Sequence, residues 1–151
     1  MYIMHFYGQK LKKFSLNQNS MTLKNIVMIA EKEIHTNQIA IKLTSPMICR
    51  NHNRETKKDM YYCYEREEFD KYIRINIEEQ MEAENLDKSL LEGFKITPIK
   101  ARKTVILVYS KMIECSLGTF MIEGKKELLN YLLKAGIGSK KAMGFGLMEL
   151  I

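Results

Sequence analysis

The chain has 151 residues, of which 46% are hydrophobic and 28% are charged, with a formal net charge of +6 and an isoelectric point near 9.1. This composition excludes a disordered chain, and the length suffices for one well-buried core. No apolar stretch approaches the length of a membrane-spanning helix, and the three cysteines lack metal-ligand spacing, which fits a reducing cytoplasm. The basic charge favours an anionic partner.

The first 37 residues are too few and too mixed to build a domain alone. Lys10–Lys13 is a basic segment of the kind that ends a helix, and Asn17–Ser20 is predicted to form a turn. Leu23–Ile34 contains several β-branched residues and is predicted to form one strand.

Ile39–Leu43 alternates with the period of a half-buried strand, which we expect to continue past Pro46 through Cys49. A polar, basic run follows from Arg50 to Asp59, and the tyrosine-rich segment Tyr61–Tyr64 comes next. Basic side chains beside aromatic rings suit phosphate contact and base stacking. A solvated loop whose tyrosines fold onto the core is the alternative.

Arg66–Leu86 carries apolar residues at helical spacing opposite an acidic side, so it is predicted to be an amphipathic helix. Lys125–Ala135 is predicted to be a second, leucine-rich helix, and Pro98 suggests a break or an edge strand. The remaining segments are predicted strands, with a turn near Ser116: Phe94–Thr97, Val105–Tyr109, Met112–Cys115, Gly118–Ile122 and Phe145–Ile151. From Ile39 onward the order is that of an α+β, ferredoxin-like (RRM-like) βαββαβ unit with an antiparallel sheet.

The segment Gly136–Gly146 holds four of the eight glycines around a Ser139-Lys140-Lys141 centre. Glycine lets a backbone turn sharply and approach a ligand, and amides together with lysines favour an anion such as phosphate. A helix precedes this segment and a strand follows it, which argues against a P-loop or a dinucleotide-binding loop. The alternative is that Gly136 ends a helix and the later glycines ease entry into a strand.

Three segments resemble CRISPR-associated endoribonucleases of the RAMP superfamily, which cut repeat RNA in antiviral defence. They are G-I-G-S-K-K-A-M-G-F-G-L at 136–147, G-T-F-M-I-E-G at 118–124 and Leu-Thr-Ser-Pro at 43–46. The resemblance implies two ferredoxin-like units side by side. Residues 1–37 then look like the last helix and strand of the first unit, and residues 38–151 like the C-terminal RNA-binding unit.

The same resemblance implies CRISPR RNA maturation through metal-independent attack of a ribose 2′-hydroxyl on the adjacent phosphate, without a cofactor. CRISPR repeat RNA is the implied partner, and other interference-complex subunits or a second copy are open alternatives. Because the family's catalytic histidine usually lies in the first unit, this chain supplies mainly the RNA-binding half. The expected RNA-binding residues are Gly136, Gly138, Ser139, Lys140, Lys141, Gly144, Phe145 and Gly146, together with Arg50, Arg54, Lys100, Arg102 and Lys103.

Cleavage of this kind needs groups that take up and donate protons, and histidine is the usual choice. Of the three histidines, His52 has the densest polar surroundings and is the candidate catalytic residue, with a plain RNA-contacting role as its alternative. His5 and His35 have no companion residues. A non-catalytic RNA-binding module of RRM-like topology and a small-molecule regulatory domain are the competing functions.

Overall fold

A computed structural model describes residues 12–27 and 32–151, and the chain divides between Lys32 and Glu33 into two compact units. In the first unit, β1 (Lys13–Leu16) and β2 (Asn19–Thr22) form an antiparallel hairpin. The expected turn is present, with Asn17 at a positive φ of 51° that asparagine tolerates well. Of the helix end expected at Lys10–Lys13, residues 10 and 11 lie outside the described ones, and Lys13 begins β1.

The strand expected for Leu23–Ile34 is absent from its described residues, 23–27 and 32–34. Composition favoured it, but a strand also requires a partner that accepts its hydrogen bonds. Ile34 is instead buried in the larger unit, where Asn130 bonds both its N–H and its C=O, at 2.9 and 2.8 Å.

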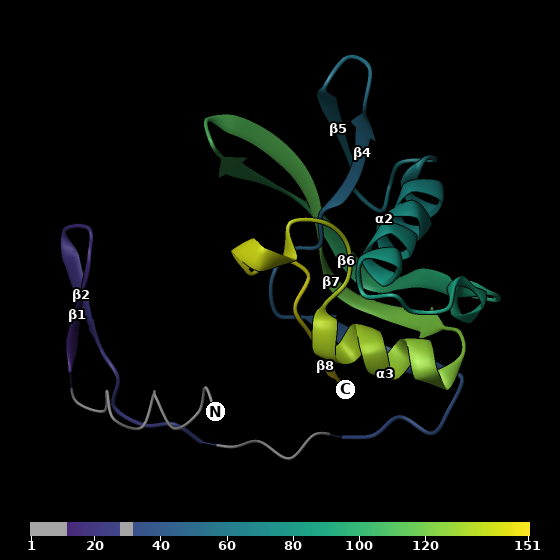
Figure 1. Ribbon diagram of the computed structural model, residues 1–151, viewed down its shortest axis with the longest axis horizontal. Coiled ribbons are helices and arrows are strands. Elements are labelled where there is room, and N and C mark those ends of the chain that lie inside the picture. Colours follow the sequence, from purple (N-terminus) through teal and green to yellow (C-terminus); the bar gives the residue numbers. More distant parts are fainter. Residues whose placement is uncertain (1–11, 28–31) are drawn as a thin grey trace. The chain divides into compact units, whose positions relative to one another are not determined.

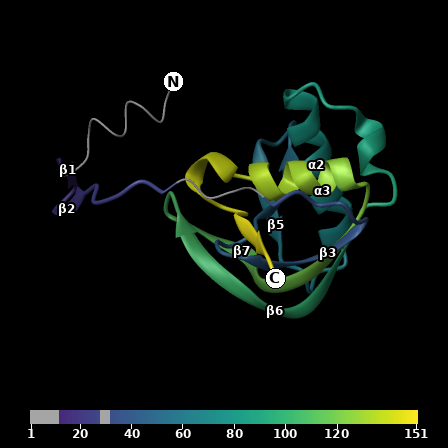
Figure 2. The ribbon, with the colours of Figure 1, turned by 90° about the horizontal axis from the view of Figure 1, so that it is seen from below.

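The larger unit is built on a four-stranded antiparallel sheet with the order β6-β7-β3-β8. Figure 2 shows both helices on one face of this sheet. The bounds in chain order are β3 (Gln38–Leu43), β4 (Cys49–Asn53), β5 (Lys58–Tyr62), α2 (Phe69–Ala83), β6 (Lys95–Val108), β7 (Lys111–Glu123), α3 (Lys126–Ala135) and β8 (Met148–Leu150). This mixed α+β arrangement is consistent with a ferredoxin-like fold.

The core lies between the sheet and the helices. Alternation puts Ile41 of β3 and Phe120 of β7 on the helix-facing side, where they meet Ile73 of α2 and Leu132 of α3. All four side chains are completely buried. The two amphipathic helices expected from the sequence are therefore confirmed, α2 being shorter than expected at both ends.

The expectation of a single strand running through Pro46 to Cys49 is wrong. β3 ends at Leu43, and Cys49 begins β4, which pairs with β5 outside the main sheet. The polar run, for which a solvated loop was the alternative interpretation, is therefore a hairpin, which projects beyond the helices in Figure 1. Polar composition concealed it, because the ladder between two strands depends on register and not on apolar residues.

The turn expected near Ser116 is also wrong. β7 continues through Ser116, and the reversal lies at Tyr109 and Ser110, both at positive φ, as in the tight turns that join hairpin strands. Pro98 meets its expectation, since it lies on the edge strand β6 beside a register shift between Pro98 and Lys100.

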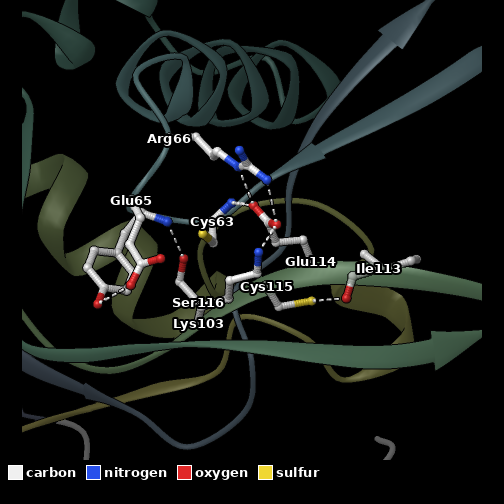
Figure 3. A network of polar contacts seen from close by, with 9 residues as sticks. Cys63, Glu65, Arg66, Lys103, Ile113, Glu114, Cys115 and Ser116 are labelled. Atoms are coloured by element: carbon white, nitrogen blue, oxygen red, sulfur yellow. Dashed lines mark hydrogen bonds and ion pairs between the residues drawn. The ribbon is translucent and has the colours of Figure 1, made fainter.

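The half-buried Glu114 of β7 joins the β6–β7 hairpin to the segment that leads into α2 (Figure 3). Its Oε1 accepts hydrogen bonds from the Cys63 N–H and the Arg66 Nε, both at 3.0 Å, while its Oε2 accepts from the Arg66 Nη2 at 3.2 Å. Lys103 of β6 forms an ion pair with the same carboxylate. The hydrogen bonds from Arg66, against the opposing effect of burial, hold the Glu114 pKa far below its ordinary value near 4.5, with further lowering by Lys103 and the Cys63 N–H.

Glu114→Gln should lower the free energy of unfolding by about 2 kcal/mol at pH 7, because the Cys63 N–H, Arg66 and Lys103 lose the anionic acceptor that they share. A carboxylate with a depressed folded pKa stabilises fully above its unfolded pKa, and that stability is lost as the pH falls toward the folded pKa. The difference between wild type and variant, measured by urea unfolding, should therefore shrink below about pH 4.5.

Glu78→Gln is the matched control, since Glu78 forms an ion pair with exposed Lys88, at 3.1 Å, and should change the stability by less than about 0.5 kcal/mol. Equal effects of the two substitutions at pH 7 would contradict the role given to Glu114.

Candidate functional site

The glycine-rich segment 136–147 packs directly against the chain between β3 and β4. Ser139 N donates to Ile48 O at 2.8 Å, Gly146 N donates to Pro46 O at 2.9 Å, and Ile137 N donates to Gly146 O at 2.9 Å. These three amides are therefore bonded within the protein. These three are not available to an anion, so the expectation that the loop's amides hold phosphate does not extend to them.

Two glycines are required here by the close approach of backbones. A Cβ on Gly146 would lie 1.9 Å from Ile137 O, and one on Gly138 would lie 2.5 Å from Ile48 O, distances that no side chain accommodates. Gly144 also has a positive φ, of 85°, but faces open space. Gly136 ends α3 with a φ of 79°, as in the helix-ending alternative.

The Leu-Thr-Ser-Pro segment at 43–46 lies against the end of the glycine-rich segment. Thr44 N and Ser45 N both donate to Leu147 O, at 2.9 and 3.3 Å, and Leu147 N donates to the Ser45 Oγ at 2.9 Å. Two stretches about 100 residues apart in sequence thus form one hydrogen-bonded structure. The hydrogen bonds between them explain why the two motifs occur together in the sequence.

Lys140 and Lys141 lie at the partly exposed side of this segment, next to the exposed residues Ala142–Gly144. Lys140 has a left-handed φ of 58° and precedes the short 3₁₀ turn Lys141–Met143. Partial burial lowers the Lys141 pKa, although Glu84 opposes this effect. The proposed phosphate contact of these two lysines stays a prediction.

The β4–β5 hairpin holds a polar cluster around His52. His52 and Asp59 are direct cross-strand partners, and the His52 Nδ1 lies 2.7 Å from the Asp59 Oδ1. The other carboxylate oxygen accepts from the Tyr61 OH at 3.0 Å and lies 3.7 Å from the Arg50 Nη1. Arg54 is exposed near the hairpin turn, in which Asn53 Oδ1 accepts from two backbone N–H groups.

The cluster perturbs two pKa values. Burial alone would raise the Asp59 pKa, but hydrogen bonds from His52 and Tyr61 and the charge of Arg50 give a net lowering. Burial and the bond to Asp59 raise the pKa of Tyr61 to about 12. Asp59 is therefore an anion at neutral pH, and Tyr61 is a neutral donor.

A second, smaller core connects the hairpin to the glycine-rich segment. Tyr61 of β5 and Phe145 of the loop both pack against the buried cluster formed by Ile48, Val108, Ile113 and Cys115. The expected site residues from the two regions are therefore anchored on the same apolar cluster.

The sheet face turned away from the helices carries a row of cations. Lys42 of β3 pairs in register with Thr119 of β7, which pairs with Lys100 of β6, while Arg102 lies opposite Leu117. Lys42 also forms an exposed ion pair with Glu149 of β8 at 3.4 Å. A cavity of about 440 Å³ opens among these strands, and its lining residues are Lys42, Leu43, Lys100, Ala101, Arg102, Leu117, Gly118 and Thr119.

Lys103 lies on the opposite face of β6 from Lys100 and Arg102. Its ammonium is already paired with Glu114 on the helix side of the hairpin. The three basic residues, which are close in the sequence, thus lie on two faces of the sheet. Because Lys103 is paired with Glu114, it is the least suited of the three to bind an RNA phosphate.

In the described ranges 12–27 and 32–151, no group of His, Cys, Asp or Glu residues is arranged to hold a metal ion. Nor does any helix in those ranges have the length and apolarity to cross a membrane. His35 is exposed, and His5 lies outside the described residues.

The family described as "CRISPR associated protein Cas6, C-terminal" matches residues 29–150, which is most of the chain. The chain belongs to the Cas6 family. This agrees with the RAMP resemblance of the three sequence segments. Among curated proteins, none matched the sequence significantly.

Solved structures support the Cas6 assignment. The product of a Cas6-related gene from Pyrococcus furiosus has 26% identity and a TM-score of 0.76, and a RAMP protein described as binding different RNA substrates has 25% identity and the same TM-score. Each match covers 92% of this chain and 58% of the solved one, so this chain spans less than two thirds of their length. A further Cas6 structure, at 20% identity and a TM-score of 0.75, shares the fold over 99% of this chain and 63% of its own.

The sequence did not point to three residues of this Cas6 family chain that contact or lie beside the expected site residues. Lys42 could have been found from the strand alternation, because it faces away from Ile41 and Leu43. Asp59 and Glu114 gave no such signal, since their partners depend on the register of β4 with β5 and of β6 with β7.

Gly146→Ala should lower the free energy of unfolding by about 3 kcal/mol or more, because the added Cβ overlaps Ile137 O and the backbone must separate. Gly144→Ala is the matched control, with a similar φ but open space, and should cost only about 1 kcal/mol. Urea unfolding of both variants measures the difference. Similar losses for the two would show that conformational preference, and not the backbone contact, requires glycine at 146.

Proposed function

We propose that this chain recognises CRISPR repeat RNA and takes part in its cleavage by metal-independent 2′-hydroxyl attack, supplying mainly the RNA-binding half of a cytoplasmic Cas6 protein. The observation that carries the proposal is a cationic sheet face, centred on Lys42, Lys100 and Arg102, in a chain that matches the Cas6 C-terminal family over residues 29–150. The RNA-binding description of one solved relative supports the same partner.

The proposed unit is a ferredoxin-like βαββαβ domain over residues 38–151, with the β4–β5 hairpin inserted after its first strand. Residues 1–37 are proposed to be the remnant of a first such unit. Other interference-complex subunits or a second copy are the proposed protein partners.

Phosphates of the RNA are proposed to contact Lys100, Arg102, Lys140 and Lys141, whose positive charges favour a polyanion. Arg50 and Arg54 of the β4–β5 hairpin are proposed to add further phosphate contacts, and the partly exposed Phe145 to offer an aromatic face for stacking. Gly136, Gly138 and Gly146 contribute by shaping the loop that presents Ser139 and the lysines, while Gly144 leaves room for close approach of the RNA.

His52 is the proposed proton-transfer residue. The 2′-oxygen bonds to phosphorus while its proton passes to the His52 Nε2, the bond from phosphorus to the 5′-oxygen breaks, and the leaving oxygen takes a proton from water. The products are a 2′,3′-cyclic phosphate and a free 5′-hydroxyl.

The second candidate is a non-catalytic RNA-binding module. It is favoured by the match to the C-terminal part of Cas6, because the same basic surface would bind RNA without cutting it.

Cleavage is tested with labelled RNA transcribed from a CRISPR repeat of the host genome, in the presence of a chelator. We expect a cut at a single position with a cyclic-phosphate end, and no cut when the 2′-hydroxyl before that position is replaced by hydrogen. Intact RNA that binds with an affinity falling steeply with salt would identify the second candidate. Absence of binding at low salt would contradict both.

Lys100→Ala combined with Arg102→Ala should weaken binding of this RNA about tenfold at moderate salt and flatten the dependence of log Kd on log salt by about 1.5, because two phosphate contacts are lost. The matched control is Lys71→Ala with Lys126→Ala, which removes the same charge from the two helices. Filter binding over a series of salt concentrations separates a local contact from a general effect of net charge. Equal weakening by both pairs would contradict the role of the open sheet face.

Lys140→Ala combined with Lys141→Ala should weaken binding by a similar factor, because both lysines are partly exposed in the glycine-rich segment and their charges favour a polyanion. The same helix-face pair is the control, in the same filter-binding assay. Unchanged affinity would remove these lysines from the interface while leaving the sheet face in place.

A further inference from the structure

We propose that Asp59 is a positioning residue, which fixes the tautomer and the orientation of His52 for proton transfer on bound RNA, and that Tyr61 and Arg50 hold Asp59 in place. This inference rests on the proposed function, because it concerns the residue that takes the proton there.

The first step of the argument is the contact between Asp59 and His52. The two residues lie directly opposite each other on paired strands, so the backbone itself sets their separation. At 2.7 Å between Nδ1 and Oδ1, an anionic carboxylate binds only a ring nitrogen that carries hydrogen. In a neutral imidazole, the Nε2 then has a free lone pair, and this is the form that accepts a proton.

The second step is the support of the carboxylate. The Asp59 Oδ2 accepts from the Tyr61 OH at 3.0 Å and lies 3.7 Å from the Arg50 Nη1, so both oxygens are engaged. Arg50 is fixed in turn by the buried Asn76 of α2, which bonds its backbone N–H at 2.8 Å and its C=O at 2.7 Å. In proton-transfer sites the base is usually oriented by a second side chain, and that side chain is fixed by further hydrogen bonds.

The third step is access. The His52 side chain is 40% exposed, whereas the Asp59 side chain is 22% exposed. The pair therefore presents the imidazole outward and the carboxylate inward. The charged and titratable groups that face the cluster are Asp59, Arg50 and Tyr61 of the hairpin, with Cys115 of β7 near Tyr61, while α2 contributes the neutral Asn76.

If the Asp59–His52 pair served only the fold, removing the Asp59 carboxylate would destabilise the protein. A pair whose imidazole faces solvent contributes little to stability, and the hairpin is also held by its backbone ladder and by the packing of Tyr61 on the second core. Loss of the carboxylate should therefore leave the fold intact and alter the state of the imidazole.

The first experiment needs no RNA. Nitrogen-15 NMR of histidine-labelled protein reports which ring nitrogen carries hydrogen, and His52→Gln assigns the His52 signals among those of the three histidines. We expect the neutral ring to carry hydrogen on Nδ1 in the wild type and mainly on Nε2 in Asp59→Asn. Glu55→Gln, which removes the same charge from the same hairpin, should keep the wild-type tautomer. An Nε2-protonated ring in the wild type would overturn the proposal.

The second experiment measures cleavage of the repeat RNA under single-turnover conditions. Asp59→Asn should lower the cleavage rate about 100-fold with the RNA Kd within about twofold of wild type, because a wrongly protonated ring binds but does not accept a proton. Glu55→Gln should change neither value by more than about twofold, and Asp59→Glu should recover part of the lost rate.

The outcomes separate the inference from the proposed function. Cleavage by the wild type with an equal rate in Asp59→Asn would overturn the role of Asp59 and leave RNA cleavage standing. RNA bound but left uncut by the wild type would overturn the cleaving function itself, and the role of Asp59 with it. Unfolding curves for both Asp59 variants should match that of the wild type, and a large loss of stability in both would assign Asp59 to the fold.

Discussion

The close contact between two backbones, that of residues 136–147 and that of residues 44–48, is the constraint on which the rest of the larger unit depends. Hydrogen bonds from Ser139 and Gly146 to the carbonyls of Ile48 and Pro46 close it, and the absence of side chains at Gly138 and Gly146 permits it. Because one segment leads into β8 and the other leads into β4, this contact fixes the fourth strand of the sheet and the base of the projecting hairpin together.

The same contact helps to position the glycine-rich segment and the β4–β5 hairpin, which hold most of the candidate site residues. Phe145 reaches the second core only because its loop is held against Ile48, and Tyr61 reaches the same core from the hairpin. Tyr61 also bonds Asp59, which bonds His52. The glycines thus act on the candidate site through packing. Three amides of the loop, those of Ile137, Ser139 and Gly146, donate to carbonyls of the protein and not to a ligand.

Two sides of the sheet have separate electrostatic roles. On the helix side, Glu114 pairs with both Lys103 and Arg66 and joins a hairpin to the segment that leads into α2. On the open side, the charges of Lys100 and Arg102 remain turned to solvent around the cavity. Alternation along β6 therefore converts one basic run in the sequence into a structural cation and two cations that are suited to a polyanion.

The sequence by itself determined the two helices, the mixed α+β class of fold and the family, because apolar periodicity and glycine content are local signals. Only the tertiary structure decided that Arg50–Tyr62 is a hairpin, that β7 runs unbroken through Ser116, and that Asp59 meets His52 and Glu114 meets Lys103. Each of these depends on strand register. A shift of one residue exchanges the faces of a strand without changing its composition, and no local pattern in the chain records that choice.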